Sequence, residues 1–229
     1  MSARPFIVAI DGPAGAGKST VSKVLARRLG FALVDTGAIY RSVALKARRE
    51  GLAFDDDEKL GELLSRVHIS FQVEGEDNHV FLDGEDVSGE IRTPENSMAA
   101  SQVSSRPVVR AGLLSLQRRL ALQAPKGAIL EGRDIGTVVF PDADAKFFLE
   151  ADPSTRARRR FEELFQKGVE RSLEEVLADQ IKRDQDDASR AVAPLKPAED
   201  AVRLDSTIMP LSEVVRVLEQ TILERMSKR

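Results

Sequence analysis

Residues 12 to 19 constrain the fold of this chain more than any other segment. They read Gly-Pro-Ala-Gly-Ala-Gly-Lys-Ser and match the phosphate-loop pattern G-x-x-x-x-G-K-[ST]. An apolar run from Phe6 to Ile10 precedes the motif, and a helical pattern of apolar residues from Val21 to Leu29 follows it. This strand, loop and helix order predicts a loop whose backbone N–H groups and helix N-terminus bind a polyphosphate.

The motif also predicts which atoms meet a nucleoside triphosphate. Lys18 is expected to reach the β- and γ-phosphates, and the Ser19 hydroxyl is expected to face Mg²⁺. The residues expected to bind ATP are Gly12, Pro13, Ala14, Gly15, Ala16, Gly17, Lys18, Ser19 and Thr20. The loop by itself does not say what happens to the γ-phosphate.

Composition narrows the class of protein. A chain of 229 residues suffices for one large α/β domain or for a domain with a small insert. The formal net charge of −3 shows no basic excess, so a nucleic acid polymer is not an expected partner. The absence of cysteine excludes a disulfide framework and a Cys-ligated zinc site. The chain has two histidines, so a metal site or a catalytic triad built on histidine is not expected.

Targeting signals are not apparent in the sequence. The residues before Phe6 leave no room for a signal peptide, and no apolar run reaches the ~18 residues that would span a bilayer. We therefore expect a cytoplasmic protein that does not associate with a membrane.

Apolar runs alternate with helical patterns along most of the chain. Buried strands are predicted at 31–34, 128–130, 145–149 and 202–204. The alternation predicts a P-loop three-layer α/β/α fold around a parallel sheet. Active residues are then expected at the carboxyl ends of strands, where Asp11-Gly12, Asp35-Thr36 and Arg133-Asp134 fall.

One segment has a different pattern. Residues 68–73 alternate polar and apolar side chains, residues 79–82 form a second short run, and 85–88 are a candidate third strand. Turns are predicted at 75–78 and at Asp83-Gly84. We expect a small antiparallel insert here, followed by helices that begin near Pro94 and Pro107.

Arginines gather where a helix follows the strand at 145–149. Arg156, Arg158, Arg159 and Arg160 stand on this segment, and a guanidinium is a permanently charged planar clamp for phosphate. The N-K-x-D motif of switch GTPases is absent, and Ile129-Leu130-Glu131 is a weak candidate for the acidic strand of motor ATPases. The pattern favours a small-molecule kinase, although a charge run is also typical of a solvated helix face.

Further blocks carry a resemblance to a known family. Asp35-Thr-Gly-Ala-Ile-Tyr-Arg41 resembles the D-[ST]-G-A-x-Y-R segment of bacterial cytidylate kinases. The likeness continues through residues 84–92, Ala100 to Val103 with Arg110, residues 131–141, 190–195 and 204–207. These blocks run from residue 7 to about residue 210, nearly the whole chain.

The resemblance implies an activity and an organisation. Members of this family transfer the γ-phosphoryl group of ATP to CMP or dCMP. The chain is then a single P-loop kinase domain over 1–229, with an antiparallel nucleoside monophosphate insert at 66–92 and an arginine-rich helical lid at about 153–170. The loop 205–207 would approach the adenine.

The resemblance also implies roles at matching positions. Arg41, Arg133 and Arg190 would hold the acceptor phosphate, Ser101, Arg110 and Asp134 would recognise cytosine, and Arg183 and Asp187 would contact the sugar. Thr36 and Tyr40 complete the expected CMP site, although Tyr40 is as compatible with a core position. The residues expected to act in catalysis are Lys18, Arg133, Arg156 and Arg160.

Two alternatives stay open at this level. The chain could phosphorylate another small acceptor such as UMP, or it could be a non-catalytic nucleotide sensor. A carboxylate such as Asp134 can accept a hydrogen bond from the cytosine amine, which favours CMP over UMP. We expect ATP, Mg²⁺ and the nucleotide substrates as ligands, and a monomer. The preference between CMP and dCMP is not predicted.

Overall fold

A computed structural model describes residues 4–74, 77–166 and 168–229. The chain divides into two compact units. One unit combines residues 1–34 with residues 118–229, and the other comprises residues 35–117. We call them the phosphate-loop unit and the insert unit.

The phosphate-loop unit is built on a five-stranded sheet with the order β2-β6-β1-β7-β8. The central strand β1 pairs in parallel with β6 and β7, and β7 pairs in parallel with β8. The strands are β1 (Phe6–Asp11), β2 (Ala32–Asp35), β6 (Gly127–Gly132), β7 (Ala145–Glu150) and β8 (Val202–Asp205). The parallel sheet with helices is the α/β fold that the alternation predicts.

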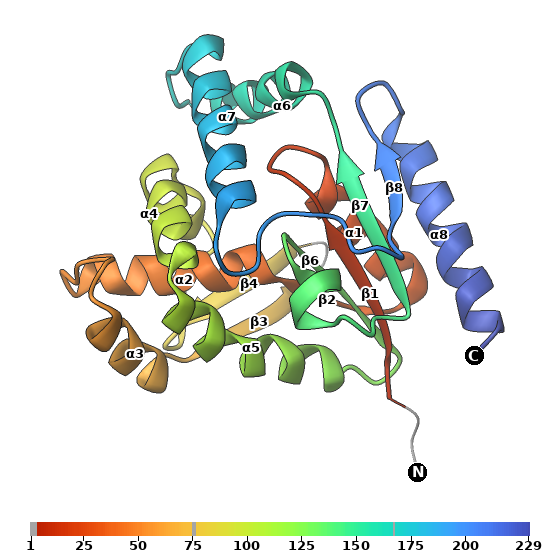
Figure 1. Ribbon diagram of the computed structural model, residues 1–229, viewed down its shortest axis with the longest axis horizontal. Helices are drawn as coiled ribbons and strands as arrows, with labels where there is room; N and C mark the ends of the chain where they lie inside the picture. Colours follow the sequence, from red (N-terminus) through yellow and green to blue (C-terminus); the bar gives the residue numbers. More distant parts are fainter. Residues whose placement is uncertain (1–3, 75–76, 167) are drawn as a thin grey trace. The chain divides into compact units, whose positions relative to one another are not determined.

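Helices cover this sheet because its inner strands β1, β6 and β7 are buried on both faces. All six residues of β1 are buried. On one face, α1 and α8 pack together, and their apolar residues form one cluster with Val8, Ile10 and Phe147 of the strands. Figure 1 shows α8 running alongside β8. The helices of this unit are α1 (Lys18–Leu29), α6 (Pro153–Gln166), α7 (Leu173–Ser189) and α8 (Leu211–Ser227).

The insert unit combines helices with the small antiparallel sheet. The sheet has the order β3-β4-β5, and α2 packs against α4. The elements are α2 (Thr36–Arg49), α3 (Asp57–Arg66), β3 (Ile69–Glu74), β4 (Asp77–Leu82), β5 (Glu85–Asp86), a 3-10 turn η1 (Glu90–Arg92), α4 (Pro94–Ser105) and α5 (Pro107–Leu122). The last residues of α5 belong to the phosphate-loop unit.

Local signals in the sequence set several boundaries of helices and turns. Gly30 ends α1 in the left-handed conformation with φ of 66°, and Thr93 caps α4 through its side chain. Asp83 and Gly84 both have positive φ, as a tight hairpin turn requires. Of the turn predicted at 75–78, the first two residues lie outside the described part, and the last two belong to β4.

One element is not predicted by periodicity. Residues Ile135–Val139 form a short π-helical turn, η2, directly after β6. No helix in the described ranges combines the length and the hydropathy that crossing a membrane requires.

Candidate functional site

The phosphate loop joins β1 to α1 in conformations that side chains disfavour. Gly12, Gly15 and Gly17 have φ of 145°, 78° and 88°. A Cβ at Gly12 would lie 2.0 Å from the carbonyl oxygen of Leu149, so the loop packs directly on the backbone of β7. Glycine is the residue that tolerates both conditions. All nine residues predicted to bind ATP therefore lie in one loop and the first turn of α1.

Lys18 is held inside this loop. Its side chain is buried, and Nζ donates a hydrogen bond to the carbonyl oxygen of Pro13 at 2.7 Å. Burial lowers the pKa of Lys18 and the charge of Arg133 lowers it further, while the carboxylates of Glu131 and Asp11 act in the opposite direction. The ammonium is thus positioned at the loop but poorly solvated, which favours exchange of its partner for phosphate oxygens.

Ser19 has a carboxylate partner that the sequence only weakly indicated. Its Oγ donates to Oε2 of Glu131 at 2.7 Å. Glu131 is buried near the end of β6, in register with Ile10 of β1. The signal was an apolar strand, Ile129-Leu130, that ends in an acid. A serine hydroxyl and a carboxylate are the hard oxygen donors that Mg²⁺ prefers, so this pair fits the ion.

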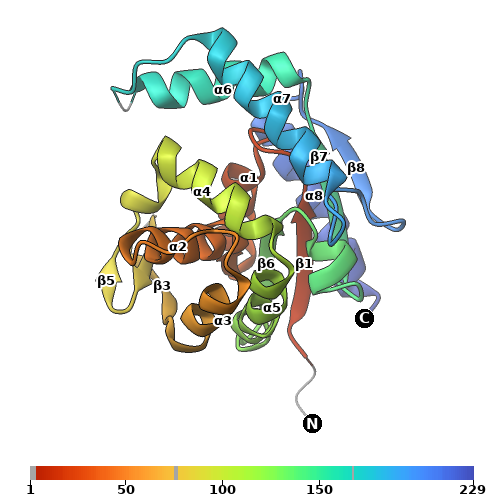
Figure 2. The same ribbon diagram turned by 60° about the vertical axis from the view of Figure 1, so that its left-hand side comes forward.

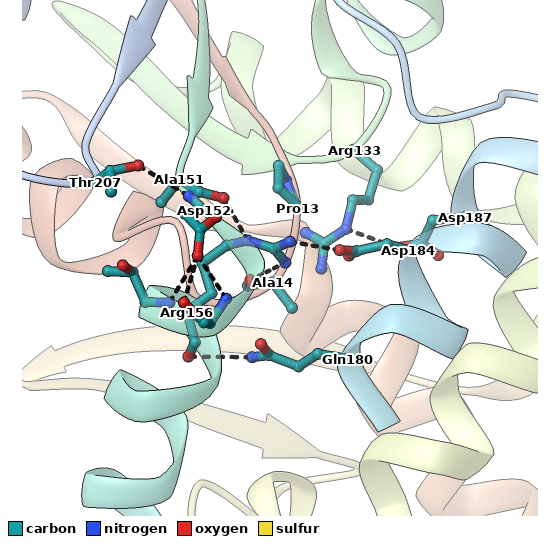
Figure 3. A network of polar contacts seen from close by, with 12 residues as sticks. Pro13, Ala14, Arg133, Ala151, Asp152, Arg156, Gln180, Asp184, Asp187 and Thr207 are labelled. Atoms are coloured by element: carbon teal, nitrogen blue, oxygen red, sulfur yellow. Dashed lines mark hydrogen bonds and ion pairs between the residues drawn. The ribbon is translucent and has the colours of Figure 1, made fainter. Parts of the chain in front are cut away.

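Two arginines of α6 contact the phosphate loop. Arg156, which is 3% exposed, donates from Nε to the carbonyl of Ala151 at 2.8 Å and from Nη1 to that of Ala14 at 3.1 Å. Arg159 donates to the carbonyl of Gly15 at 3.4 Å. Arg160, which is expected with Arg156 to act in catalysis, forms an ion pair of 3.0 Å with Glu163 on its own helix. Figure 3 shows Arg156 between Ala151, Ala14 and Asp184.

Helix α7 supplies the counter-charges. Figure 2 shows α7 crossing beside α6, and the two helices pack together. Asp184 pairs with Nη2 of Arg156 at 2.7 Å. One turn earlier, Gln180 donates to the carbonyl oxygen of Arg156 at 3.3 Å. These two side chains attach α7 to the arginine that contacts the phosphate loop.

Asp187 gathers three predicted site residues. Its Oδ2 accepts a hydrogen bond from Nε of Arg133 at 2.9 Å, and its Oδ1 pairs with Arg190. Burial alone would raise the pKa of Asp187, but the guanidinium groups of Arg133, Arg190 and Arg183 together lower it. The phosphate-loop unit therefore brings Arg133, Arg183 and Arg190 together around the buried carboxylate of Asp187.

Asp134 lies between Arg133 and the π-helical turn. It is buried, and it occupies the position before η2 without capping that turn through its side chain. The cap comes from another strand: Asp11 accepts hydrogen bonds from the backbone N–H groups of Ile135 at 2.8 Å and Gly136 at 2.7 Å. Asp11 is a site residue that the motif did not identify, although its place at the end of β1 was noted.

The loop after β8 is also attached to the phosphate loop. Ser206 donates from Oγ to the carbonyl oxygen of Ala16 at 3.1 Å, and its own carbonyl accepts from Arg159 at 2.6 Å. Thr207 accepts a hydrogen bond from the backbone N–H of Asp152 at 2.9 Å. The segment for which the resemblance implied an adenine contact thus joins the phosphate loop to the start of α6.

The remaining predicted residues lie in the insert unit. Thr36, Tyr40 and Arg41 occupy the first turns of α2, whereas Ser101 lies on α4 and Arg110 on α5. The Arg110 guanidinium lies 5.4 Å from the centre of the Tyr40 ring, and its Nη1 donates to the carbonyl oxygen of Ser104 at 2.9 Å. Tyr40 therefore orients an arginine rather than serving only as core.

Asn96 supports the same group from α4. Its Nδ2 donates to the carbonyl oxygens of Arg41 at 3.0 Å and Ile91 at 3.2 Å. In the described ranges, no group of three or more His, Cys, Asp or Glu side chains is placed to hold a metal ion. Each unit thus carries its own set of predicted site residues.

Comparison with known proteins gives a consistent family. The sequence profile of the cytidylate kinase family matches residues 8–224. A cytidylate kinase from Geobacter sp. (strain M21) is 52% identical over 97% of this chain and 94% of its own length, and one from Vibrio parahaemolyticus is 46% identical over the full length of both. Among solved structures, TT1252 from Thermus thermophilus is 25% identical over 97% of this chain and 98% of its own, with a TM-score of 0.45. The chain belongs to the cytidylate kinase family.

Proposed function

We propose that this chain transfers the γ-phosphoryl group of ATP to CMP or dCMP, giving ADP and CDP or dCDP. The observation that carries the proposal is the phosphate-loop geometry, with Lys18 held at Pro13 and two α6 arginines on the loop carbonyls. The family to which the chain belongs supports the acceptor.

The transfer needs positioned positive charge more than a reactive side chain. Charge in the transition state spreads over the oxygens of the transferred group, so catalysis depends on placing cations around it. Lys18 and Arg156 are proposed to act from the donor side and Arg133 from the acceptor side, while Arg159 and Arg160 are competing candidates for a further contact. No covalent enzyme intermediate is required.

The Ser19–Glu131 pair is proposed to hold Mg²⁺ together with the ATP phosphates. Mg²⁺ keeps several waters and needs only one or two protein oxygens when phosphates are present. When bound, it neutralises charge on the β- and γ-phosphates. Ser19 is then expected to exchange its hydrogen bond to Glu131 for the ion.

The roles proposed for the acceptor residues are those that the family resemblance implies. Arg41, Arg133 and Arg190 would bind the phosphate, Arg183 and Asp187 the sugar, and Ser101, Arg110 and Asp134 the cytosine. Residues 66–92 would form the nucleoside monophosphate insert, and residues 153–170 the lid. A pocket whose polar groups are paired only by cytosine rejects uracil because its carbonyl would face the Asp134 carboxylate.

The experiment is an ADP-release assay with ATP and Mg²⁺ against CMP, dCMP, UMP, AMP and GMP. We expect fast turnover with CMP and dCMP, slower turnover with UMP and very little with the purines. The control is Lys18→Ala, which should lose turnover while it keeps its fold by circular dichroism. Absence of acceptor-dependent turnover in the wild type would overturn the proposal, and an equal rate with UMP would overturn the cytosine site.

A further inference from the structure

The end of β1 carries a buried carboxylate that the transfer reaction does not use directly. Asp11 is 4% exposed and immediately precedes Gly12, the first residue of the phosphate loop. Each of its two oxygens accepts one backbone hydrogen bond, Oδ1 from Ile135 at 2.8 Å and Oδ2 from Gly136 at 2.7 Å. Both donors are in the turn that follows Arg133 and Asp134.

The strand register explains why these groups meet. Asp11 pairs with Gly132 across the β1–β6 ladder, so the chain leaves β6 beside the carboxylate. The first N–H groups of a helical turn have no acceptor within that turn. Asp11 supplies both acceptors from the neighbouring strand, and Asp134 contributes no side-chain cap.

Packing leaves little freedom around this contact. A Cβ at Gly136 would lie 3.2 Å from Cδ of Lys146 and 3.4 Å from Oδ2 of Asp11. Lys146 is itself buried and donates from Nζ to Asp200 at 2.9 Å. The turn is therefore fixed by hydrogen bonds on one side and by close packing on the other.

Keeping the Asp11 carboxylate ionised at this buried position costs free energy. Burial raises the pKa of Asp11 to about 6, and the two backbone hydrogen bonds only partly oppose that effect. Perturbed pKa values of this kind are typical of functional positions. Here the carboxylate orders the turn that follows Asp134.

We propose that Asp11 is a positioning residue for the acceptor site: it fixes Arg133 and Asp134 relative to the phosphate loop by accepting both N–H groups of the following turn. This inference rests on the proposed roles of Arg133 and Asp134. The Asp11 side chain then extends the β1–β6 ladder, so that the donor loop and the segment after β6 are held together beyond the last paired residues. Misplacement of a positioned group by about 1 Å costs on the order of 100-fold in rate.

The test is Asp11→Asn, which keeps the shape but turns an NH₂ donor toward one of the two N–H groups. We expect kcat/KM for CMP to fall by about 10- to 100-fold. We also expect the CMP-to-UMP preference to approach that of Asp134→Ala, while KM for ATP stays within about twofold of wild type. A merely structural role would not separate the acceptor from the donor in this way.

The matched control is Asp144→Asn. Asp144 accepts a hydrogen bond from the backbone N–H of Ile7 at 2.7 Å, near the opposite end of the same strand. This variant should lose stability without changing the CMP-to-UMP preference. If Asp11→Asn does not fold, Gly136→Ala tests the same turn, since its methyl group would lie tightly against Cδ of Lys146 at 3.2 Å and in contact with Oδ2 of Asp11 at 3.4 Å.

The outcomes separate this inference from the proposed function. A wild type that does not prefer CMP over UMP overturns the proposed cytosine site. A wild type with that preference, unchanged in folded Asp11→Asn and in Gly136→Ala, overturns the role of Asp11. Loss of preference in Asp144→Asn as well would show a general effect of strand β1 and would also overturn it.

Discussion

The ion pairs near the phosphate loop differ in burial from those beside the small antiparallel sheet of the insert unit. In the phosphate-loop unit, Asp187, which pairs with Arg133, is only 1% exposed, and Asp184, which pairs with Arg156, is 25% exposed. In the insert unit, Arg49 pairs with Glu85 and Glu90, and these three side chains are 35%, 60% and 49% exposed. A buried pair that loses one partner leaves an uncompensated charge, whereas an exposed pair contributes little. The difference indicates that the first set fixes the positions of its arginines, whereas the second set joins exposed side chains of α2, β5 and the following turn.

Removal of the Asp187 carboxylate is expected to have the largest effect on stability. Asp187→Ala leaves Arg133 and Arg190 close together without their shared counter-charge. We expect a loss of about 3–5 kcal/mol in the free energy of unfolding, measured in urea. KM for CMP should rise in the same variant. A loss no larger than that of an exposed pair would contradict the structural role of this carboxylate.

The pH dependence of stability tests a second buried charge. The pKa of Asp11 is raised to about 6, by burial first, with Asp134 adding to the rise and Lys18 opposing it. The folded protein therefore binds a proton more tightly than the unfolded chain, and this contribution to stability is lost as pH rises from about 4 to about 6.

The size of that effect follows from the shift. A difference of about two pH units corresponds to about 3 kcal/mol. The measurement is the free energy of unfolding of wild type minus that of Asp11→Asn between pH 4 and pH 7. We expect this difference to fall with rising pH. A flat or rising difference would show that the carboxylate is ionised at little cost.

Replacement of Arg156 by lysine tests whether geometry as well as charge matters. Arg156 bonds to Ala151, Ala14 and Asp184 through separate nitrogens, and one ammonium cannot reproduce that fork. We expect Arg156→Lys to lose about 2 kcal/mol of stability and to raise KM for ATP. The matched control is Arg171→Lys, whose partners Glu175 and Asp179 are exposed. Equal losses in both variants would contradict the expectation.

The smallest effect is expected in the insert unit. Arg49→Ala removes the exposed pairs with Glu85 and Glu90 and should cost about 0–1 kcal/mol. The loss should shrink further in 0.5 M salt, since exposed pairs are screened. A cost comparable to that of Asp187→Ala would remove the distinction between the two units.

The sequence predicts most of the fold because its signals are local. The phosphate-loop glycines, Pro94 and Pro107 at helix starts, and Asp83-Gly84 at a hairpin each act through their own backbone. The turn Ile135–Val139 was not predicted because Asp11, which caps it, is 124 residues away in sequence. The periodicity of apolar residues in a short stretch of sequence carries no information on a contact between residues so far apart.

The candidate site was predictable in composition but not in detail. The family resemblance implied roles for Arg133, Asp187 and Arg190, and the structure adds that one carboxylate holds both arginines. Likewise, the helical spacing of Arg156 and Arg160 could not show which neighbour faces the loop, because a run of arginines presents one to every side. Arg159 contacts the carbonyl of Gly15, and Arg160 contacts Glu163.

The contact of Gly12 with the backbone of Leu149 has a mechanical consequence. Strand β7 and the phosphate loop approach each other so closely that no side chain fits between them, since a carbonyl oxygen already occupies the space that a Cβ at Gly12 would need. Thr207 holds the next segment through the N–H of Asp152. Arg156 and Arg159 of α6 also donate to the carbonyl oxygens of Ala14 and Gly15, so a movement of α6 away from the phosphate loop would have to break both hydrogen bonds.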